Sequence, residues 1–128
     1  MKKRDNIIYW VATLWLALGM TSTGIVQLMG NPAEREMMAH LGYPMYLLTI
    51  LGVSKILGVV AILVPKAPLP KEWAYAGFAF VMIGAAVSHL ALGDPATDLF
   101  GPVLLLALTC ISWYFRPRGR RIIPNKTL

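Results

Sequence analysis

Four long apolar runs, separated by short polar stretches, dominate the pattern of hydrophobic and polar positions along the 128-residue chain. Each run is long enough to cross about 30 Å of hydrocarbon as a helix, and a helix satisfies its own backbone hydrogen bonds there. The pattern therefore predicts an all-α, integral membrane four-helix bundle that forms a single domain over residues 1–128. The predicted spans are residues 7–28, 46–64, 73–92 and 99–115.

The segment between the first and second spans follows a shorter pattern. Asn31 can cap a helix, Pro32 suits the first helical position, and Gly42 suits the residue after the last turn. Between them, methionine and leucine side chains can face lipid or the bundle while charged side chains stay in water. We predict a short amphipathic helix here, with His40 as a solvated residue at the interface.

The other two connections are short. Residues 65–71 hold three prolines, so we expect a stiff extended connector without helix. Residues 93–98 form a turn in which Asp98 is placed to cap the fourth span.

Composition and charge agree with a membrane protein. The chain is 57% hydrophobic and 14% charged, which is more apolar surface than a soluble domain of this length could bury. The net charge of +6 comes from Lys and Arg clusters before the first span, between the second and third, and after the fourth. This distribution argues against a nucleic-acid partner. Because cytoplasmic loops carry an excess of Lys and Arg, it predicts that both termini are cytoplasmic.

Two features bear on processing and redox chemistry. Lys2-Lys3-Arg4 resembles the basic region of a cleaved signal peptide, but the apolar run that follows is longer than the usual core of such peptides, so we favour a retained span. Cys110 is the single cysteine, which excludes an internal disulfide and a Cys-x-x-Cys pair. We expect Cys110 to be a small packing residue.

Lys55 is the residue of the second span that most needs an explanation. It lies near the middle of an apolar run, where burying an ammonium group costs on the order of 3 kcal/mol. Gly52 and Gly58 flank it at helical spacing and allow a neighbouring helix to approach, so we expect Lys55 to face protein. Its role is either in a functional site or purely in packing, through hydrogen bonds to carbonyls or hydroxyls.

Other polar residues belong to the same outer half of the membrane. Gln27 lies near the outer end of the first span, His89 near the outer end of the third, and Asp94 in the turn that follows. Side chains lean toward the N-terminus of their helix, which brings Lys55 and His89 toward one level. We predict an outward-facing pocket that includes these four residues. The two histidines of the chain lack the spacing of strong metal sites, so we predict no metal site.

Two short motifs carry a family resemblance. They are Leu51-Gly52-x-x-Lys55-Ile56-Leu57-Gly58 in the second span and Ser88-His89-Leu90-x-x-Gly93-Asp94 after the third. With the four spans, they make the chain similar to the DoxX-like family of small membrane proteins. The resemblance implies a four-helix bundle in the plasma (inner) membrane. It also implies that some relatives work with quinone-linked oxidoreductases, including thiosulfate oxidation, that others have no defined activity, and that some vertebrate relatives resemble membrane-protein chaperones.

These observations support one main hypothesis and two alternatives. In the first, the protein is a component of a quinone-linked membrane oxidoreductase, and Lys55 and His89 hydrogen-bond or protonate a quinone headgroup. The sequence holds no recognisable electron carrier, so a redox partner subunit or a bound cofactor would be needed. In the second, it is a non-enzymatic membrane assembly or interaction factor in which both residues are structural. A small transporter is the weakest, because small four-span exporters rely on an acidic residue in the first span and this span has none.

Overall fold

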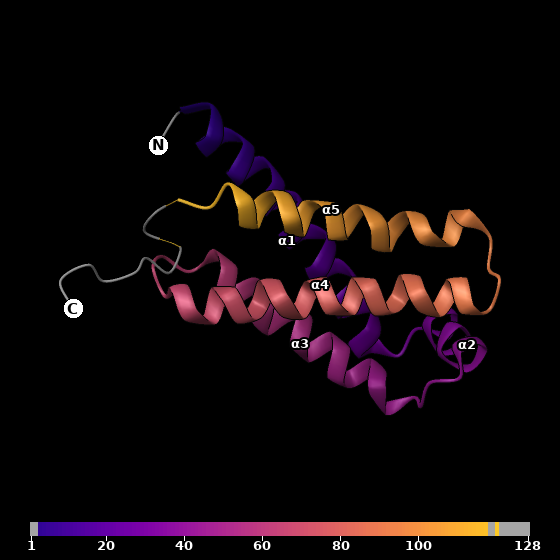
Figure 1. Cartoon of the computed structure of the whole chain (residues 1–128). Coiled ribbons are helices and arrows are strands. Elements are labelled where there is room, and N and C mark those ends of the chain that lie inside the picture. The colour runs from indigo at the N-terminus through magenta and orange to yellow at the C-terminus, as the bar shows by residue number, and fades with distance from the viewer. Residues whose placement is uncertain (1–2, 118–119, 121–128) are drawn as a thin grey trace, which may run out of the picture.

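The computed structural model describes residues 3–117 and 120, and those residues contain helices and no strands (Figure 1). The elements follow one another with short connections. They are α1 (Lys3–Met29), α2 (Pro32–Leu41), α3 (Tyr46–Leu63), α4 (Pro68–Ala91), the 3₁₀-helix η1 (Ala96–Leu99) and α5 (Phe100–Tyr114).

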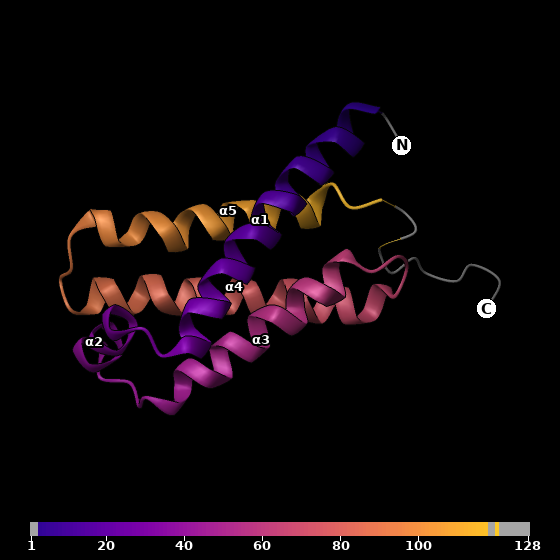
Figure 2. The same cartoon turned by 180° about the vertical axis from the view of Figure 1, so that it is seen from behind.

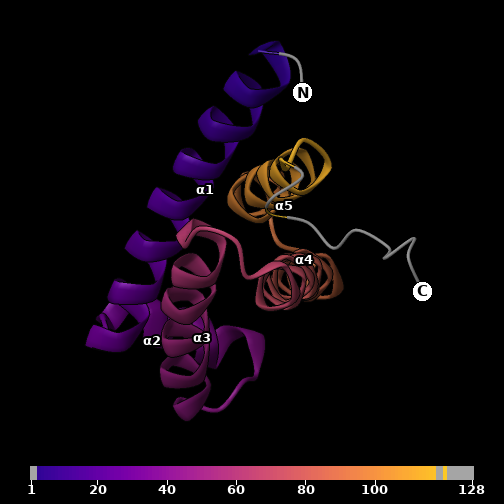
Figure 3. The same ribbon diagram turned by 90° about the vertical axis from the view of Figure 1, so that its left-hand side faces the viewer.

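The four long helices form a closed ring in which α1 contacts α3 and α5, and α4 contacts the same two helices. α4 and α5 run side by side, and α1 and α3 cross them obliquely (Figures 1 and 2). Figure 3 shows α4 and α5 nearly end-on, with α1 and α3 together on one side of them. One end of the bundle carries α2 and the connection from α4 to η1, and we call it the α2 end. The opposite end carries the start of α1, the connection from α3 to α4, and the end of α5 (Figure 1).

Four helical segments are long and apolar enough to cross a membrane: Lys3–Met29, Tyr46–Leu63, Pro68–Ala91 and Ala96–Tyr114. The predicted all-α membrane bundle is therefore confirmed, and the surroundings of these helices are a lipid bilayer. Large apolar side chains that face outward, such as Leu18, Leu57 and Phe80, fit that environment because lipid takes the place of water there.

The prediction for the connection between the second and third spans was wrong. α4 begins at Pro68, five residues before the predicted start, so the extended connector is reduced to a tight turn. Prolines are compatible with the first turn of a helix, where the missing N–H has no partner to lose. The turn is made by Lys66 and Ala67, whose φ angles of 57° and 51° lie in the left-handed region.

The short amphipathic helix between the first two spans is confirmed as α2. The Asn31 side chain accepts a hydrogen bond from the Ala33 amide at 2.9 Å, and Pro32 takes the first helical position. Gly42 ends the helix with a left-handed φ of 82°, a conformation that glycine adopts without strain.

α1 and α3 cross in close contact at Gly24 and Gly52. A Cβ added at Gly52 would lie 2.8 Å from the Gly24 carbonyl oxygen and 2.6 Å from Leu28 Cγ. No side chain larger than glycine's fits at Gly52 unless the two helices separate. Lys55 follows one helical turn later, so this crossing sets its position relative to α1.

The core lies between the four long helices, toward the end opposite α2. Its buried apolar residues are Ala12, Leu16, Ala17, Met20, Val59, Ile62, Tyr75, Phe78, Met82 and Leu108. A buried polar cluster joins three helices beside this core. Ser112 shares hydrogen bonds with Thr13 (2.6 Å) and with the Tyr75 hydroxyl (2.8 Å), so these buried hydroxyls are satisfied by one another.

Cationic side chains cover the C-terminal end of α3. Lys71 Nζ donates hydrogen bonds to the Ala61 oxygen (2.6 Å) and to the Val64 oxygen, and Arg120 donates to the carbonyls of Ile62 (2.9 Å) and Leu63 (3.3 Å). The last carbonyls of a helix have no partner within the helix and carry a partial negative charge. Two cations therefore supply the partners that this end would otherwise lack.

Candidate functional site

A cavity of about 220 Å³ opens at the α2 end. Residues of α1, α2, α3 and α4 and of the loop after α2 surround it, so it depends on the assembled bundle and on α2 together. Its lining side chains are mostly apolar, with a few polar groups among them. The polar ones are Gln27, Glu34, Tyr43, Lys55, Ser88 and His89.

Lys55 reaches this cavity from α3. Its side chain is buried, with 6% of the residue exposed. Its Nζ donates one hydrogen bond, to Thr23 Oγ1 of α1 at 3.3 Å, which is a long contact for a cation. The carboxylate of Glu34 lies on the same cavity. With one protein acceptor found for three N–H donors in the described part of the chain, Lys55 keeps capacity to bind a further group.

Gln27 is the second buried polar residue of the cavity, with 7% exposure. Its Oε1 atom is buried and has no hydrogen-bond partner among the described residues. A buried polar atom without a partner is uncommon, because it loses its water without compensation. This amide is therefore free to bond a guest in the cavity.

His89 enters from the last turn of α4 and is also buried. Its Nδ1 donates to Asp94 Oδ2 at 2.7 Å, and the other oxygen of Asp94 accepts from His40 Nε2 at 2.7 Å. One carboxylate thus joins two histidines from α2 and α4. The hydrogen bonds from His89 and then His40 hold the pKa of Asp94 below its usual value of 3.8.

This arrangement leaves the far nitrogen of the His89 ring for the cavity. No hydrogen bond to His89 Nε2 occurs in the described part of the chain, whereas Nδ1 is fixed by Asp94. A carboxylate on one nitrogen of a histidine fixes the tautomer and the ring orientation. His40 differs from its predicted role: its side chain is 56% exposed, as expected for a solvated residue, but it also bonds Asp94.

A second link joins the α2 segment to α4. The hydroxyl of Tyr43 shares a hydrogen bond of 2.5 Å with Ser88 Oγ, and Ser88 in turn donates to the Gly84 carbonyl at 2.8 Å. Sequence analysis did not single out Tyr43. The feature that could have pointed to Tyr43 is its position directly after the Gly42 cap, where the chain turns back over the bundle. The α2 segment thus covers the cavity and is held by two polar links.

The four predicted pocket residues come together in part. Lys55, His89 and Gln27 line one cavity, and Asp94 stands behind His89 without lining it. The two flanking glycines of α3 pack as expected, Gly52 against α1 and Gly58 against Phe78, since a Cβ at Gly58 would lie 2.6 Å from the Phe78 ring.

An apolar groove of about 460 Å³ continues from Lys55 along the outside of α3 and α4. Leu51, Lys55 and Val81 line both the cavity and the groove. Most other lining residues of the groove are apolar, among them Leu57, Trp73 and Phe78. The groove faces the side of the bundle that lipid would cover, so an apolar chain could lie in it while a polar group enters the cavity.

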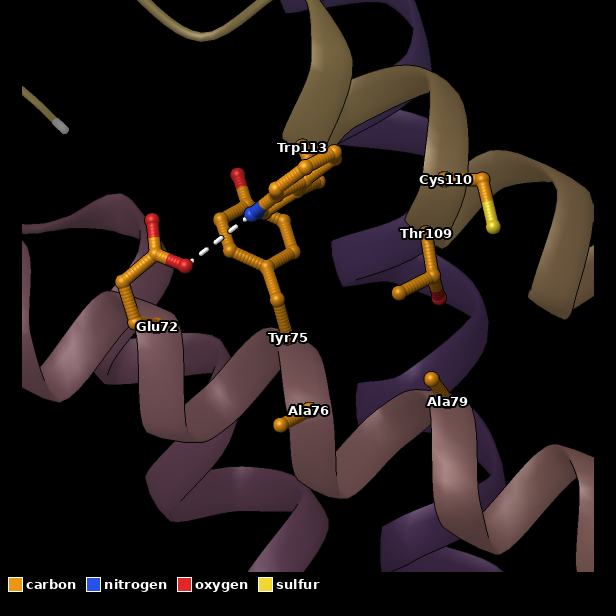
Figure 4. A pocket seen from close by; sticks show the side chains of 7 residues that line it. All are labelled: Glu72, Tyr75, Ala76, Ala79, Thr109, Cys110 and Trp113. Atoms are coloured by element: carbon orange, nitrogen blue, oxygen red, sulfur yellow. Dashed lines mark hydrogen bonds between the residues drawn. The ribbon is translucent and has the colours of Figure 1, made fainter.

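A separate pocket of about 250 Å³ lies between α4 and α5 near the opposite end (Figure 4). Trp113 Nε1 donates to Glu72 Oε2 at 3.0 Å across this pocket. Arg116 forms an ion pair with Glu72, with Nη2 at 2.9 Å from Oε1 but not aligned as a hydrogen bond, and lies 4.5 Å from the Trp113 ring centroid. Glu72 was not among the predicted site residues. The feature that could have pointed to it is that it is the one acidic residue beside the basic residues Lys66 and Lys71.

Two smaller predictions were wrong. Cys110 is exposed on α5 beside this pocket rather than packed (Figure 4), because the face of α5 that carries it is turned away from the core. Asp98 does not cap the fourth span. Asp98 lies within η1, which leads directly into α5, and neither helix has a side-chain cap. A 3₁₀ turn therefore precedes α5 in place of a capping residue.

Fold and site together define a multi-pass membrane protein with four candidate spans and a polar cavity at one end. A model of the DoxX-like family matches residues 11–112, which include all of α2, α3, α4 and η1. The chain therefore belongs to the DoxX-like family. Neither a curated protein nor a solved structure matches it.

Proposed function

We propose that this DoxX-like protein binds a membrane quinone and serves as a component of a quinone-linked oxidoreductase system. The observation that carries the proposal is the junction at Lys55, where a polar cavity inside the bundle meets an apolar groove on its lipid-facing side. A quinone has the same two parts, a polar ring and a long apolar tail.

The polar groups of the cavity suit a quinone ring. The ring carries two carbonyl oxygens, which need donors. Lys55 Nζ has N–H donors beyond its bond to Thr23, and protonation of the His89 imidazole would place a second donor at Nε2, which has no hydrogen bond in the described part of the chain. Gln27 adds an amide with an unpartnered oxygen, which could accept from the hydroxyl of the reduced ring. A volume of about 220 Å³ lies below the roughly 300–1,000 Å³ of drug-sized sites and suits one ring.

The reduction of a quinone takes up two electrons and two protons. His89, oriented by Asp94, and Lys55 would supply protons to the two oxygens of the ring, and water at the α2 end would replace them. The sequence holds no recognisable electron carrier. A redox partner subunit or a cofactor held by such a partner would deliver them, so the protein would act within a complex.

The distribution of Lys and Arg supports an orientation for this site. The flanks of the end opposite α2 are basic, and the loops of the α2 end carry one Arg against four acidic residues. By the charge bias of membrane proteins, both termini would be cytoplasmic and the cavity would open to the outside of the plasma (inner) membrane.

Quinone binding by the purified full-length protein in lipid nanodiscs tests the proposal. The probe is a short-tailed ubiquinone analogue, with quenching of tryptophan fluorescence as the readout. We expect saturable binding that Lys55→Met and His89→Gln each weaken by about tenfold or more, because each removes one hydrogen bond to the ring. Lys66→Met is the matched control, since Lys66 is exposed in the α3–α4 turn. Equal affinity in all three variants would contradict the proposal.

An assembly or interaction factor is the second candidate. It is favoured by two contacts that join separate parts of the bundle: Lys55 of α3 bonds Thr23 of α1, and His40 of α2 bonds Asp94 in the turn after α4. Thermal unfolding separates the two candidates. A binding role predicts that Lys55→Met keeps the unfolding temperature and loses quinone, whereas a structural role predicts a loss of stability.

A further inference from the structure

The turn after α4 brings together potential metal ligands, of which only His89 lines the cavity. His89, Asp94 and Asp98 each offer one ligand atom, and these atoms all lie within 4.8 Å of one another. His40 of α2 joins them through its 2.7 Å hydrogen bond to Asp94. The spacing of the two histidines along the sequence pointed away from a metal site. The fold changes this, because it brings both histidines to one carboxylate and adds a second carboxylate beside it.

Asp98 has no structural role that explains its position. It caps neither η1 nor α5, and no hydrogen bond or ion pair of its carboxylate occurs in the described part of the chain. It nevertheless stands close to the carboxylate of Asp94. Two carboxylates at this separation repel one another, so a cation between them would relieve the repulsion.

We propose that this cluster is a zinc site, in which His89 Nδ1 and one oxygen each from Asp94 and Asp98 bind Zn²⁺ and water takes the fourth position. Imidazole nitrogen and carboxylate oxygen are common ligands of zinc, and three protein ligands plus one water form an established coordination. Mg²⁺ and Ca²⁺ prefer oxygen ligands alone, so the histidine selects against them.

His40 acts as an outer partner of this site. It holds the Asp94 oxygen that does not face His89, and a hydrogen bond of this kind orients a metal-binding carboxylate. Zinc would take the place of the proton on His89 Nδ1, and the neutral imidazole would carry its proton on Nε2. Binding would also hold α2 against the turn after α4, because His40 lies in α2 and its partner Asp94 lies in that turn.

The test measures zinc bound to untagged full-length protein in detergent, after treatment with a chelator and removal of the excess. Elemental analysis should find one Zn²⁺ per chain, and isothermal titration should give a single site. Asp98→Asn and His89→Gln should weaken zinc binding by about a hundredfold or more, and His40→Ala by about tenfold as an outer partner. Glu36→Gln, at an exposed acidic residue of α2 outside the cluster, should bind zinc as the unaltered protein does.

Several outcomes would overturn the zinc site: no retained zinc in the unaltered protein, equal binding by Asp98→Asn, or equal affinity for Mg²⁺. Circular dichroism and size-exclusion chromatography check that each variant is folded, and Asp98 is exposed, so its replacement by Asn keeps the fold. The proposal is independent of quinone binding, because Asp98 does not line the cavity. Asp98→Asn that loses zinc and keeps the quinone analogue supports the zinc site alone. Zinc binding without any quinone binding leaves the zinc site standing and removes the proposed function.

Discussion

The crossing of α1 and α3 gives the most direct test of the packing that positions Lys55. Gly52→Ala adds a methyl group 2.6 Å from Leu28 Cγ and 2.8 Å from the Gly24 carbonyl oxygen. Gly77→Ala is the matched control, because Gly77 also lies inside a long helix and has nothing within 4 Å of the added atom. Both substitutions gain about 1 kcal/mol of helix propensity, which cancels in the comparison.

The difference between the two variants is then the cost of the clash. Overpacking of a methyl group costs about 1–3 kcal/mol, and here a backbone oxygen is one of the atoms that must move. At roughly 4 °C per kcal/mol for a chain of this length, Gly52→Ala should unfold about 4–12 °C below Gly77→Ala. Differential scanning fluorimetry in detergent measures this difference. Equal unfolding temperatures would show that α1 and α3 do not meet at Gly24 and Gly52, and the position assigned to Lys55 would be lost with that contact.

The remaining predictions concern the two ends of the bundle. Lys71→Met should lower the free energy of unfolding by about 1–3 kcal/mol, because it removes the hydrogen bonds that the Lys71 ammonium donates to the Ala61 and Val64 carbonyls. Lys66→Met in the exposed turn should change it little, and thermal unfolding of both variants measures the difference. Because two histidines lower the pKa of Asp94, its contribution to stability is complete above pH 3.8 and is lost as the pH falls through the lowered pKa. The unfolding temperature of Asp94→Asn should therefore fall less steeply with acid below pH 3.8 than that of the unaltered protein, and parallel curves would refute this. A reporter fused after Leu128 should be cytoplasmic and one inserted into α2 should be outside; the reverse pattern would place the cavity on the cytoplasmic side.

Much of the fold follows from the sequence because lipid restricts a chain so strongly. An apolar run must form a helix to satisfy its backbone, so four runs predict four spans to within a few residues, and the Asn31 and Gly42 caps predict α2. The start of α4 was missed because three prolines were taken to exclude a helix. Two of them stand in its first turn, where the lost N–H has no helical partner.

The site was harder to predict because it depends on loop geometry. The level and direction of helical side chains follow from helical rise and tilt, so the shared cavity of Lys55 and His89 could be expected. The contact between His40 and Asp94 could not, since it joins residues 54 positions apart through two turns whose path no periodic pattern records. The same holds for Glu72, whose partners Trp113 and Arg116 come from the far end of the chain.

The hydrogen bonds at the C-terminal end of α3 also imply an order in which the protein assembles during synthesis. Lys71 follows that helix by a few residues and can bind its carbonyls as soon as α4 begins to leave the ribosome. Arg120 is made after the whole of α5, yet it completes the same helix end and touches the Tyr9 hydroxyl of α1 at 3.5 Å. Until then the first three spans lie in the membrane while the Ile62 and Leu63 carbonyls lack their Arg120 partner. Arg120 covers these carbonyls only after α5 has been made.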